Sequence, residues 1–192
     1  MTTIVIAEDE AIIRLDLREL LEEEGYVVVG EAGRGDQAVE LVRQLTPDLV
    51  ILDVKMPGMD GIEAAKRITA EGICAVLMLT AFSQREIVEQ ARDAGAVAYL
   101  VKPFQKTELV PAIELATARY AETKALVSEV SELTERLEVR KLLDRAKGRL
   151  IDTHGMKESN AFSFIQKSAM TQRTTMRAIA ESILKGELIP PA

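Results

Sequence analysis

Short apolar runs alternate with longer amphipathic segments along the first 118 residues of the chain. Apolar runs of strand length occupy residues 3–7, 27–30, 49–52, 75–79 and 97–101. Apolar residues at helical spacing occupy residues 10–24, 36–45, 61–71, 83–94 and a segment that begins at residue 106. Because strands alternate with helices, this part of the chain is predicted to form a parallel sheet with helices on both faces.

The remainder of the chain has a helical pattern without strands. Pro111 is expected in the first turn of a helix, where its missing N–H matters little. Neither Gly nor Pro interrupts residues 112–147, and Gly148 is the next expected break. Two further helices are predicted over residues 158–169 and 171–185.

Four apolar residues in this helical part follow the 4-3-4 spacing of a coiled-coil seam: Leu126, Val130, Leu133 and Leu137. The seam loses its apolar residues at Arg140 and Asp144 and is therefore short. Two interpretations stay open at this point. The seam can pack against the C-terminal helices of its own chain, or it can form a dimer.

The composition is that of an ordinary globular protein, with 47% of the 192 residues hydrophobic and 29% charged. It excludes a wholly disordered chain, a collagen and a disulfide scaffold. Cys74 is the only cysteine, and its apolar neighbours place it in the core rather than as a reactive thiol. The apolar runs are far shorter than the roughly 18 residues that cross a bilayer, and no signal peptide opens the chain. We therefore expect a cytoplasmic protein without a membrane partner.

Charge divides the chain into an acidic front and a basic back. Residues 1–118 hold 11 Lys and Arg against 21 Asp and Glu, a net charge of −10, whereas residues 119–192 hold 13 against 10, a net charge of +3. Within residues 139–177, nine bases stand against three acids, a net charge of +6. A phosphate-bearing polymer therefore suits only the back of the chain. Charge alone leaves open the alternative that these basic residues form a solvent-exposed helix face without a ligand.

Four predicted strands end in polar residues that would meet at the carboxyl edge of the sheet. They are Glu8 and Asp9 after the first strand, Asp53 after the third, Thr80 after the fourth and Lys102 after the fifth. Three carboxylates in one pocket repel one another and need a cation, for which oxygen-only ligands favour Mg²⁺. A lysine and a hydroxyl beside them suit a transferable phosphoryl group, and a carboxylate can itself be the nucleophile. The alternative is that each is an ordinary polar residue at a strand end.

The motifs around these residues resemble a response-regulator receiver domain over residues 2–118. The matching stretches are IVIAEDE at 4–10, LVILDVKMPGMDGIEA at 49–64, LTAF at 79–82 and AYLVKPF at 98–104. The resemblance implies a doubly wound α/β fold of the flavodoxin-like type, with five parallel strands in the order 2-1-3-4-5. It also implies a protein that undergoes phosphotransfer and autodephosphorylation and is not otherwise an enzyme.

The same resemblance implies which residues receive the phosphoryl group and hold the metal ion. Asp53 would accept a phosphoryl group from a phosphohistidine of a sensor histidine kinase. Glu8, Asp9, Asp53 and the backbone carbonyl of Lys55 would surround Mg²⁺. The metal ion and the kinase are therefore the expected cofactor and partner of this domain.

Three further residues would bind the phosphoryl group and switch the domain, again by resemblance. Lys102 would pair with the phosphoryl group, Thr80 would move to hydrogen-bond it, and Tyr99 would turn inward when Thr80 moves. The Lys102–Pro103 peptide bond would be cis. The sequence leaves open that Tyr99 is simply a half-buried tyrosine of a strand.

The helical tail resembles a different module, the ANTAR domain of transcription antitermination regulators. The matching stretch is RAKGRLIDTHGMKESNAFSFIQKSAMTQRTTMRAIAESIL at 145–184. Most of the residues that carry the resemblance also fit the core of a three-helix bundle: Ala146, Gly148, Leu150, Gly155, Met156, Ala161, Phe162, Ile165, Met170 and Ala180. Ile151 and Asn160 are mild departures from the family pattern.

This second resemblance implies binding to paired RNA hairpins whose loop bases are read by the small bundle. Unpaired loops expose base edges that side chains can reach. Five basic residues are the candidates for phosphate and base contacts: Lys147, Arg149, Lys167, Arg173 and Arg177. Each of them can instead be a solvated surface residue. Phe162 is expected in the core, so stacking of bases on aromatic rings has little support.

The sequence thus predicts a receiver over residues 2–118, a helical coiled-coil linker over 119–139 and an ANTAR domain over 140–190. Phosphorylation is expected to favour a homodimer that presents two basic bundles to RNA hairpins and so controls transcription termination or antitermination. Two alternatives stay open: a DNA-binding regulator, since residues 171–185 could mimic a recognition helix, and a magnesium-dependent aspartyl phosphatase. Lys55 counts against the phosphatase, because those enzymes commonly carry an aspartate two residues after the nucleophile.

Overall fold

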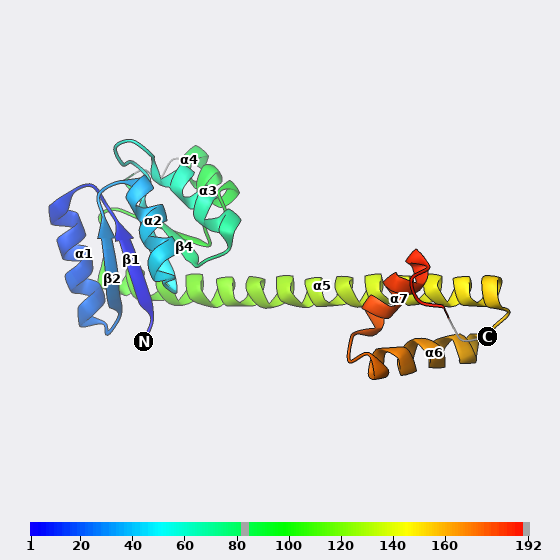
Figure 1. The fold of residues 1–192 in the computed structure, drawn as a ribbon. Helices are drawn as coiled ribbons and strands as arrows, with labels where there is room; N and C mark the ends of the chain where they lie inside the picture. The colour runs from blue at the N-terminus through cyan, green and yellow to red at the C-terminus, as the bar shows by residue number, and fades with distance from the viewer. Residues whose placement is uncertain (82–84, 190–192) are drawn as a thin grey trace. The chain divides into compact units, whose positions relative to one another are not determined.

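The computed structural model describes residues 1–81 and 85–189, and the chain divides into two compact units, Met1–Ala125 and Leu126–Ala192. The first unit alternates strands and helices (Figure 1): β1 (Thr3–Ala7), α1 (Ala11–Glu23), β2 (Val27–Ala32), α2 (Gly35–Leu45), β3 (Leu49–Asp53), α3 (Gly61–Glu71), β4 (Ala75–Thr80), α4 (Arg85–Asp93), β5 (Ala98–Val101) and the start of α5 (Lys106–His154). The second unit holds the end of α5, then α6 (Glu158–Thr171) and α7 (Met176–Lys185). None of these helices, within the described residues, is both long and apolar enough to cross a membrane.

The strands of the first unit pair in parallel in the order β2-β1-β3-β4-β5. This is the doubly wound, flavodoxin-like order that was predicted. The register sets Ala7 of β1 opposite Leu52 of β3, and Asp53 of β3 opposite Leu79 of β4. The residues that follow β1, β3 and β4 therefore meet at one edge of the sheet.

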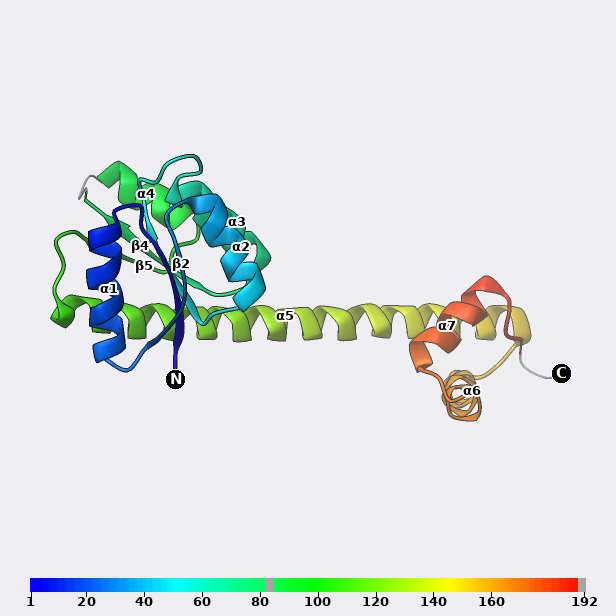
Figure 2. The ribbon, with the colours of Figure 1, turned by 60° about the vertical axis from the view of Figure 1, so that its left-hand side comes forward.

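Side-chain alternation along the strands creates a separate core on each face of the sheet. Val5 and Val50 pack with α2, α3 and α4 on one face. Ile4 and Leu49 pack with α1 and the start of α5 on the other face. Figure 2 shows α1 and α2 on opposite sides of the strands. Both faces are covered, as the continuous apolar strands β3 and β4 require.

Several strands extend further than the apolar runs indicated. β2 continues to Ala32 and β4 continues to Thr80, because backbone pairing extends past the last apolar residue of each run. The helix predicted from residue 83 is seen as α4 from Arg85. Phe82, where the LTAF motif ends, and residue 83 lie outside the described residues.

The long helix α5 runs without a break from Lys106 to His154, so the interruption expected at Gly148 is wrong. A helical Gly costs only about 1 kcal/mol relative to Ala, and its neighbours Ala146 and Leu150 are buried in the core of the second unit. Pro111 is the sixth residue of α5 rather than a residue of its first turn. It is therefore placed inside the helix, where it removes one N–H donor.

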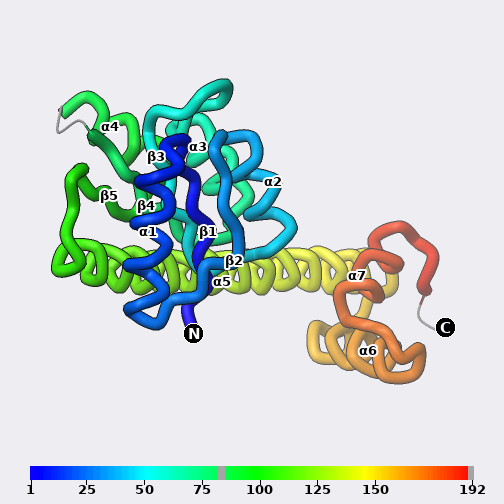
Figure 3. Tube along the Cα trace, turned by 90° about the vertical axis from the view of Figure 1, so that its left-hand side faces the viewer, coloured from blue at the N-terminus to red at the C-terminus, as the bar shows by residue number. Residues whose placement is uncertain are grey.

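The second unit has its own core, formed where α6 and α7 pack on the end of α5 (Figure 3). Its buried residues are Ala146, Leu150, Ala161, Ile165, Ala169, Ile179, Ala180 and Ile183. The three-helix arrangement was predicted, although the start of the last helix was not. α7 begins at Met176, and the hydroxyl of Thr175 caps it by accepting a hydrogen bond from the N–H of Ala178.

Two residues that were expected in this core are on the surface instead. Phe162 is 42% exposed and Met170 is 74% exposed. Each follows a buried alanine, Ala161 or Ala169, and one residue along a helix turns the side chain by about 100°. The turn carries both side chains off the buried face of α6.

The reactivity of the Cys74 thiol toward a labelling reagent tests the packing of the first unit. Cys74 is 1% exposed, as predicted, and burial raises its pKa to about 12. Because the thiolate is the reactive form, the folded protein at pH 8 should leave Cys74 unlabelled by an aromatic disulfide reagent. Unfolding in guanidinium should allow complete labelling. Labelling of the native protein at the rate of a small-molecule thiol would contradict the described core.

Candidate functional site

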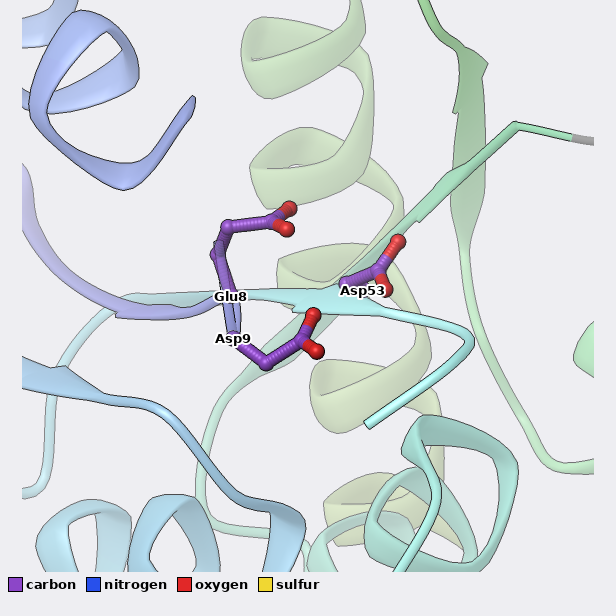
Figure 4. A group of neighbouring side chains, drawn as sticks. All are labelled: Glu8, Asp9 and Asp53. Atoms are coloured by element: carbon purple, nitrogen blue, oxygen red, sulfur yellow. The ribbon is translucent and has the colours of Figure 1, made fainter. Parts of the chain in front are cut away.

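Three carboxylates meet at the carboxyl edge of the sheet (Figure 4). Glu8 and Asp9 directly follow β1, and Asp53 is the last residue of β3. One oxygen of each carboxylate lies within 4.8 Å of the others. Glu8 and Asp53 are buried, whereas Asp9 is exposed. The parallel register of β1 and β3 therefore assembles an acidic cluster that is open to solvent on one side.

Lys102 enters the cluster from the residue that follows β5. Its Nζ lies 2.5 Å from Oε2 of Glu8 and 2.8 Å from Oδ1 of Asp53. The peptide bond between Lys102 and Pro103 is cis. One ammonium facing three carboxylates leaves a net charge of −2 when all are ionised. The donor set thus fits a hard cation such as Mg²⁺, which binds carboxylate oxygens.

Burial and charge shift the titration of two groups in this cluster. Burial raises the pKa of the Glu8 carboxyl, and the hydrogen bond from Lys102 opposes that effect. Burial on its own would lower the pKa of Lys102, but its hydrogen bonds to Asp53 and Glu8 raise the pKa above its ordinary value. Lys102 is therefore an ammonium at neutral pH, and burial makes the Glu8 carboxyl harder to ionise than an exposed glutamate.

Backbone groups and one arginine fix the carboxylates in place. The N–H of Lys55 donates to Oδ2 of Asp53 at 3.1 Å. Arg14 on α1 donates from Nη1 to the carbonyl of Glu8 at 2.5 Å and pairs through Nε with Glu31 at 3.3 Å. Arg14 was not among the residues predicted from the sequence. A cation in the second turn of the helix that follows an acidic strand end was the available signal.

Gly61, the first residue of α3, is in close contact with the backbone of Asp53. A Cβ added to Gly61 would lie 1.9 Å from the carbonyl oxygen of Asp53. The N–H of Gly61 donates to the carbonyl of Val54 at 3.0 Å. Only glycine allows α3 to begin this close to the end of β3. Gly61 was not predicted from the sequence either, because its role depends on a contact in the folded chain rather than on side-chain chemistry.

Thr80 and Tyr99 lie on neighbouring strands beside the cluster. Thr80 ends β4 and is buried, and its carbonyl accepts a hydrogen bond from the N–H of Lys102 at 2.7 Å. Tyr99 is paired with Met78 across the β4–β5 ladder and is 50% exposed. The ring of Tyr99 is thus half in solvent, which leaves both of its interpretations open.

A cleft of about 600 Å³ opens beside the carboxylates. Asp9, Asp53 and Lys102 are among its polar lining residues, and Ile13 and Phe104 are among its apolar ones. The cleft gives an approaching group access to Asp53 from solvent. A nucleophilic carboxylate, a fixed ammonium and a cation-binding set on one side of an open cleft suit phosphoryl transfer.

In the second unit, two of the five basic candidates are engaged in ion pairs. Nζ of Lys147 lies 2.9 Å from Asp144 and 3.0 Å from Glu158. Arg177 pairs with Glu181 at 3.2 Å and also lies 3.7 Å from Glu135. Both cations therefore have carboxylate partners within the second unit.

The remaining three basic candidates differ from one another in whether their side chains have hydrogen-bond or ion-pair partners. Nη1 of Arg149 donates to the carbonyl of Leu184 at 2.5 Å, which ties α5 to the end of α7. The side chains of Lys167 and Arg173 make no hydrogen bond or ion pair within residues 1–81 and 85–189. Lys167 and Arg173 are therefore the candidates whose charge is available to a ligand.

The coiled-coil seam is on the surface of α5. Leu126, Val130, Leu133 and Leu137 are each between 50% and 62% exposed. None of them belongs to the core that α6 and α7 form with the end of α5. The interpretation in which the seam packs against its own C-terminal helices is therefore wrong.

Comparison with known proteins relates both units to characterised families. The chain matches the response regulator receiver domain over residues 4–114 and the ANTAR domain over residues 131–184. The transcriptional regulatory protein PdtaR of Mycobacterium tuberculosis is 59% identical over 182 residues, which cover 95% of this chain and 89% of that protein. The chemotaxis protein CheY of Bacillus subtilis is 40% identical over 111 residues, 57% of this chain and 92% of CheY. The solved receiver domain of NarL from Mycobacterium tuberculosis has a TM-score of 0.59 at 34% identity, covering 61% of this chain and 96% of that one.

Substitution of Gly61 should disturb the carboxylate cluster. The methyl group of Gly61→Ala would overlap the Asp53 carbonyl, so we expect the free energy of unfolding to fall by about 1–3 kcal/mol. Mg²⁺ should raise the melting temperature of the wild-type protein and should raise that of Gly61→Ala less. Gly33→Ala is a matched control, because an added Cβ there meets only Nη1 of Arg14, at 3.7 Å. Equal stability and an equal response to Mg²⁺ in Gly61→Ala and wild type would contradict the described contact.

Proposed function

Because the chain belongs to the response regulator receiver family and carries an ANTAR domain behind its receiver, we propose that phosphorylation of the receiver controls RNA binding by the tail. The chain is a regulator rather than an enzyme. A sensor histidine kinase is the proposed phosphoryl donor, and RNA hairpins are the proposed ligand of the tail. The observation that carries the proposal is the cluster of Glu8, Asp9 and Asp53 with Lys102 beside an open cleft.

We propose Asp53 as the phosphoacceptor. A carboxylate oxygen of Asp53 attacks the phosphorus of a phosphohistidine, the P–N bond breaks, and the imidazole leaves. Glu8, Asp9, Asp53 and the backbone carbonyl of Lys55 would hold Mg²⁺, which supplies positive charge next to the incoming dianion. The oxygen-only donor set supports this choice of metal.

Three residues would then bind the phosphoryl group or change conformation when it is bound. Lys102 already contacts Asp53 and can turn its ammonium toward a phosphoryl oxygen. The hydroxyl of Thr80 would move to donate to another oxygen, and the half-exposed ring of Tyr99 would turn inward. Support comes from the burial of Thr80 at the end of the strand next to β3 and from the solvent exposure of Tyr99.

The division of the chain follows from these roles: a receiver over residues 2–118, a coiled-coil linker over 119–139 and an ANTAR domain over 140–190. The exposed seam Leu126, Val130, Leu133 and Leu137 supports a homodimer that forms on phosphorylation, because an apolar stripe with heptad spacing is stabilised by a second copy. The dimer would present two bundles to paired RNA hairpins.

RNA hairpins are proposed as the ligand because the second unit combines positive charge with available cations. Residues 139–177 carry a net charge of +6, and Lys167 and Arg173 have no partner within the described residues. Binding to hairpins in a transcript would change whether a terminator forms, and so control termination or antitermination. Such binding would weaken as salt rises, because each neutralised phosphate releases counterions.

Phosphoryl labelling tests the acceptor. Wild-type protein incubated with Mg²⁺ and radiolabelled acetyl phosphate should take up label, whereas Asp53→Asn should remain at background because an amide is a poor nucleophile. Chelation of Mg²⁺ should also abolish labelling of the wild type, since the dianion would then face Glu8 and Asp9 without compensation. Asp93→Asn, which alters an exposed carboxylate outside the cluster, is the control and should label normally. Normal labelling of Asp53→Asn would exclude Asp53 as the acceptor.

Sedimentation of a seam variant tests the dimer. The double substitution Leu133→Asp and Leu137→Asp would place four charges in a twofold seam, so the phosphorylated variant should sediment as a monomer. Ser128→Asp with Ser131→Asp adds the same charge at non-seam positions of the heptad and should still dimerise. If the leucine variant dimerises as the wild type does, the seam is not the interface.

A further inference from the structure

Helix α6 has an exposed row of three side chains, Phe162, Gln166 and Met170, to which the proposed function assigns no role. We call this row the α6 stripe. Its members are four residues apart, so they lie on one face with a spacing of about 6 Å along the helix. The buried row Ala161, Ile165 and Ala169 faces the core instead. The stripe is therefore a surface feature that packing does not require.

The two phenylalanines of α6 have different environments. Phe164 packs against the core of the second unit, whereas Phe162 does not contribute to it and is 42% exposed. Met170, at 74%, is even more exposed. An aromatic ring and a thioether that lie outside the core on one helix face are available to an apolar or aromatic partner.

The charge around the stripe favours a polyanion. Residues 159–176 contain no Asp or Glu, although the whole chain has 31. Glu158, immediately before this segment, is paired with Lys147. Lys167 lies within the segment, and neither it nor Arg173 has a side-chain partner in the part of the chain that the structure describes. The stripe thus combines apolar contact area with uncompensated positive charge.

Arg173 stands just beyond the C-terminal end of the stripe. It has a positive φ of 52°, in a turn closed by hydrogen bonds from its own N–H to the carbonyl of Met170 at 3.3 Å and from the N–H of Thr174 to the carbonyl of Ala169 at 3.0 Å. The turn keeps the backbone of Arg173 next to α6. A basic residue therefore directly follows the C-terminal end of the stripe.

We propose that the α6 stripe, with Arg173 at its end, is the surface on which unpaired bases of an RNA loop stack and are read; the inference rests on the proposed RNA binding. The ring of Phe162 offers a stacking platform, and Met170 offers apolar contact. The amide of Gln166 lies between them and can donate to and accept from a base edge. Arg173 supplies charge for the adjoining phosphate.

Other surfaces of the second unit fit this ligand less well. The coiled-coil seam is apolar too, but residues 126–139 hold four Glu against one Arg, and this negative charge repels a polyanion. A second copy of the chain meeting the stripe through a twofold axis would bring the same face against itself. Lys167 and Arg173 would then approach their own copies with no carboxylate between residues 159 and 176 to compensate them.

A binding experiment on the full chain tests the stripe. RNA hairpins with one fixed stem and a randomised loop are selected on the wild-type protein with acetyl phosphate and Mg²⁺. The affinity of each variant is then measured for the selected hairpin and for a fully paired RNA of equal length. Phe162→Ala should weaken hairpin binding about 5- to 100-fold, the range expected when one stacking contact is lost. Its affinity for paired RNA should stay unchanged.

Matched variants separate stacking from folding. Phe162→Tyr keeps an aromatic ring and should bind the hairpin like the wild type. Ile151→Ala removes an exposed apolar side chain from α5 and should have no effect. Met170→Ala and Gln166→Ala change surface residues and should also weaken binding to the selected loop. These two variants test the stripe even if Phe162→Ala lowers the melting temperature of the protein.

The outcomes distinguish this inference from the function on which it rests. If the wild-type protein selects a loop and the three alanine variants of the stripe bind it equally well, the stripe is not the reading surface, and the proposed RNA binding stands. If the wild-type protein selects no loop and binds no hairpin, the proposed RNA binding fails and the inference fails with it.

Discussion

The functional site of the first unit depends on one interaction, the repulsion among the carboxylates of Glu8, Asp9 and Asp53. The ammonium of Lys102 partly offsets this repulsion. The parallel register brings three carboxylates together, and a single ammonium contacts two of them. Burial raises the pKa of Glu8 because that carboxylate is costly to ionise without added positive charge. A site of this kind favours a divalent cation, and together with the cation it favours a dianionic phosphoryl group. Lys102 is in direct contact with Asp53, so the proposed phosphorylation of Asp53 would change the charge that Lys102 faces.

The division of charge between the units explains why one chain carries two kinds of surface. The acidic receiver, at −10, suits a cation and a transferable phosphoryl group and repels a polyanion. In the second unit, Lys147 and Arg177 form ion pairs, whereas Lys167 and Arg173 form none within the described residues. The exposed seam and the α6 stripe both offer apolar side chains, and the charges around them are our reason for proposing a second copy of the chain at the seam and RNA at the stripe.

Much of the fold and of the acidic cluster could be predicted, because both depend on local patterns. Alternation of apolar runs indicates the sheet, and strand ends bring Glu8, Asp9 and Asp53 to one edge. Gly61 could not be found in this way, because its importance lies in a contact with the Asp53 backbone that only the folded chain contains. Phe162 was misplaced for a related reason: it is two residues from Phe164, and only the packing of α6 decides which ring is buried.

The central claim is that chemistry at Asp53 controls binding of RNA by the second unit. Sequencing of RNA crosslinked to the chain in its host cells tests this claim most directly, with wild-type and Asp53→Asn chains compared while the sensor kinase is active. We expect the wild-type chain to be crosslinked to transcripts containing paired hairpins, at their loops, and Asp53→Asn to recover far less of the same RNA. Equal recovery by the two chains, or no enrichment of hairpin-containing RNA with the wild-type chain, would contradict this expectation.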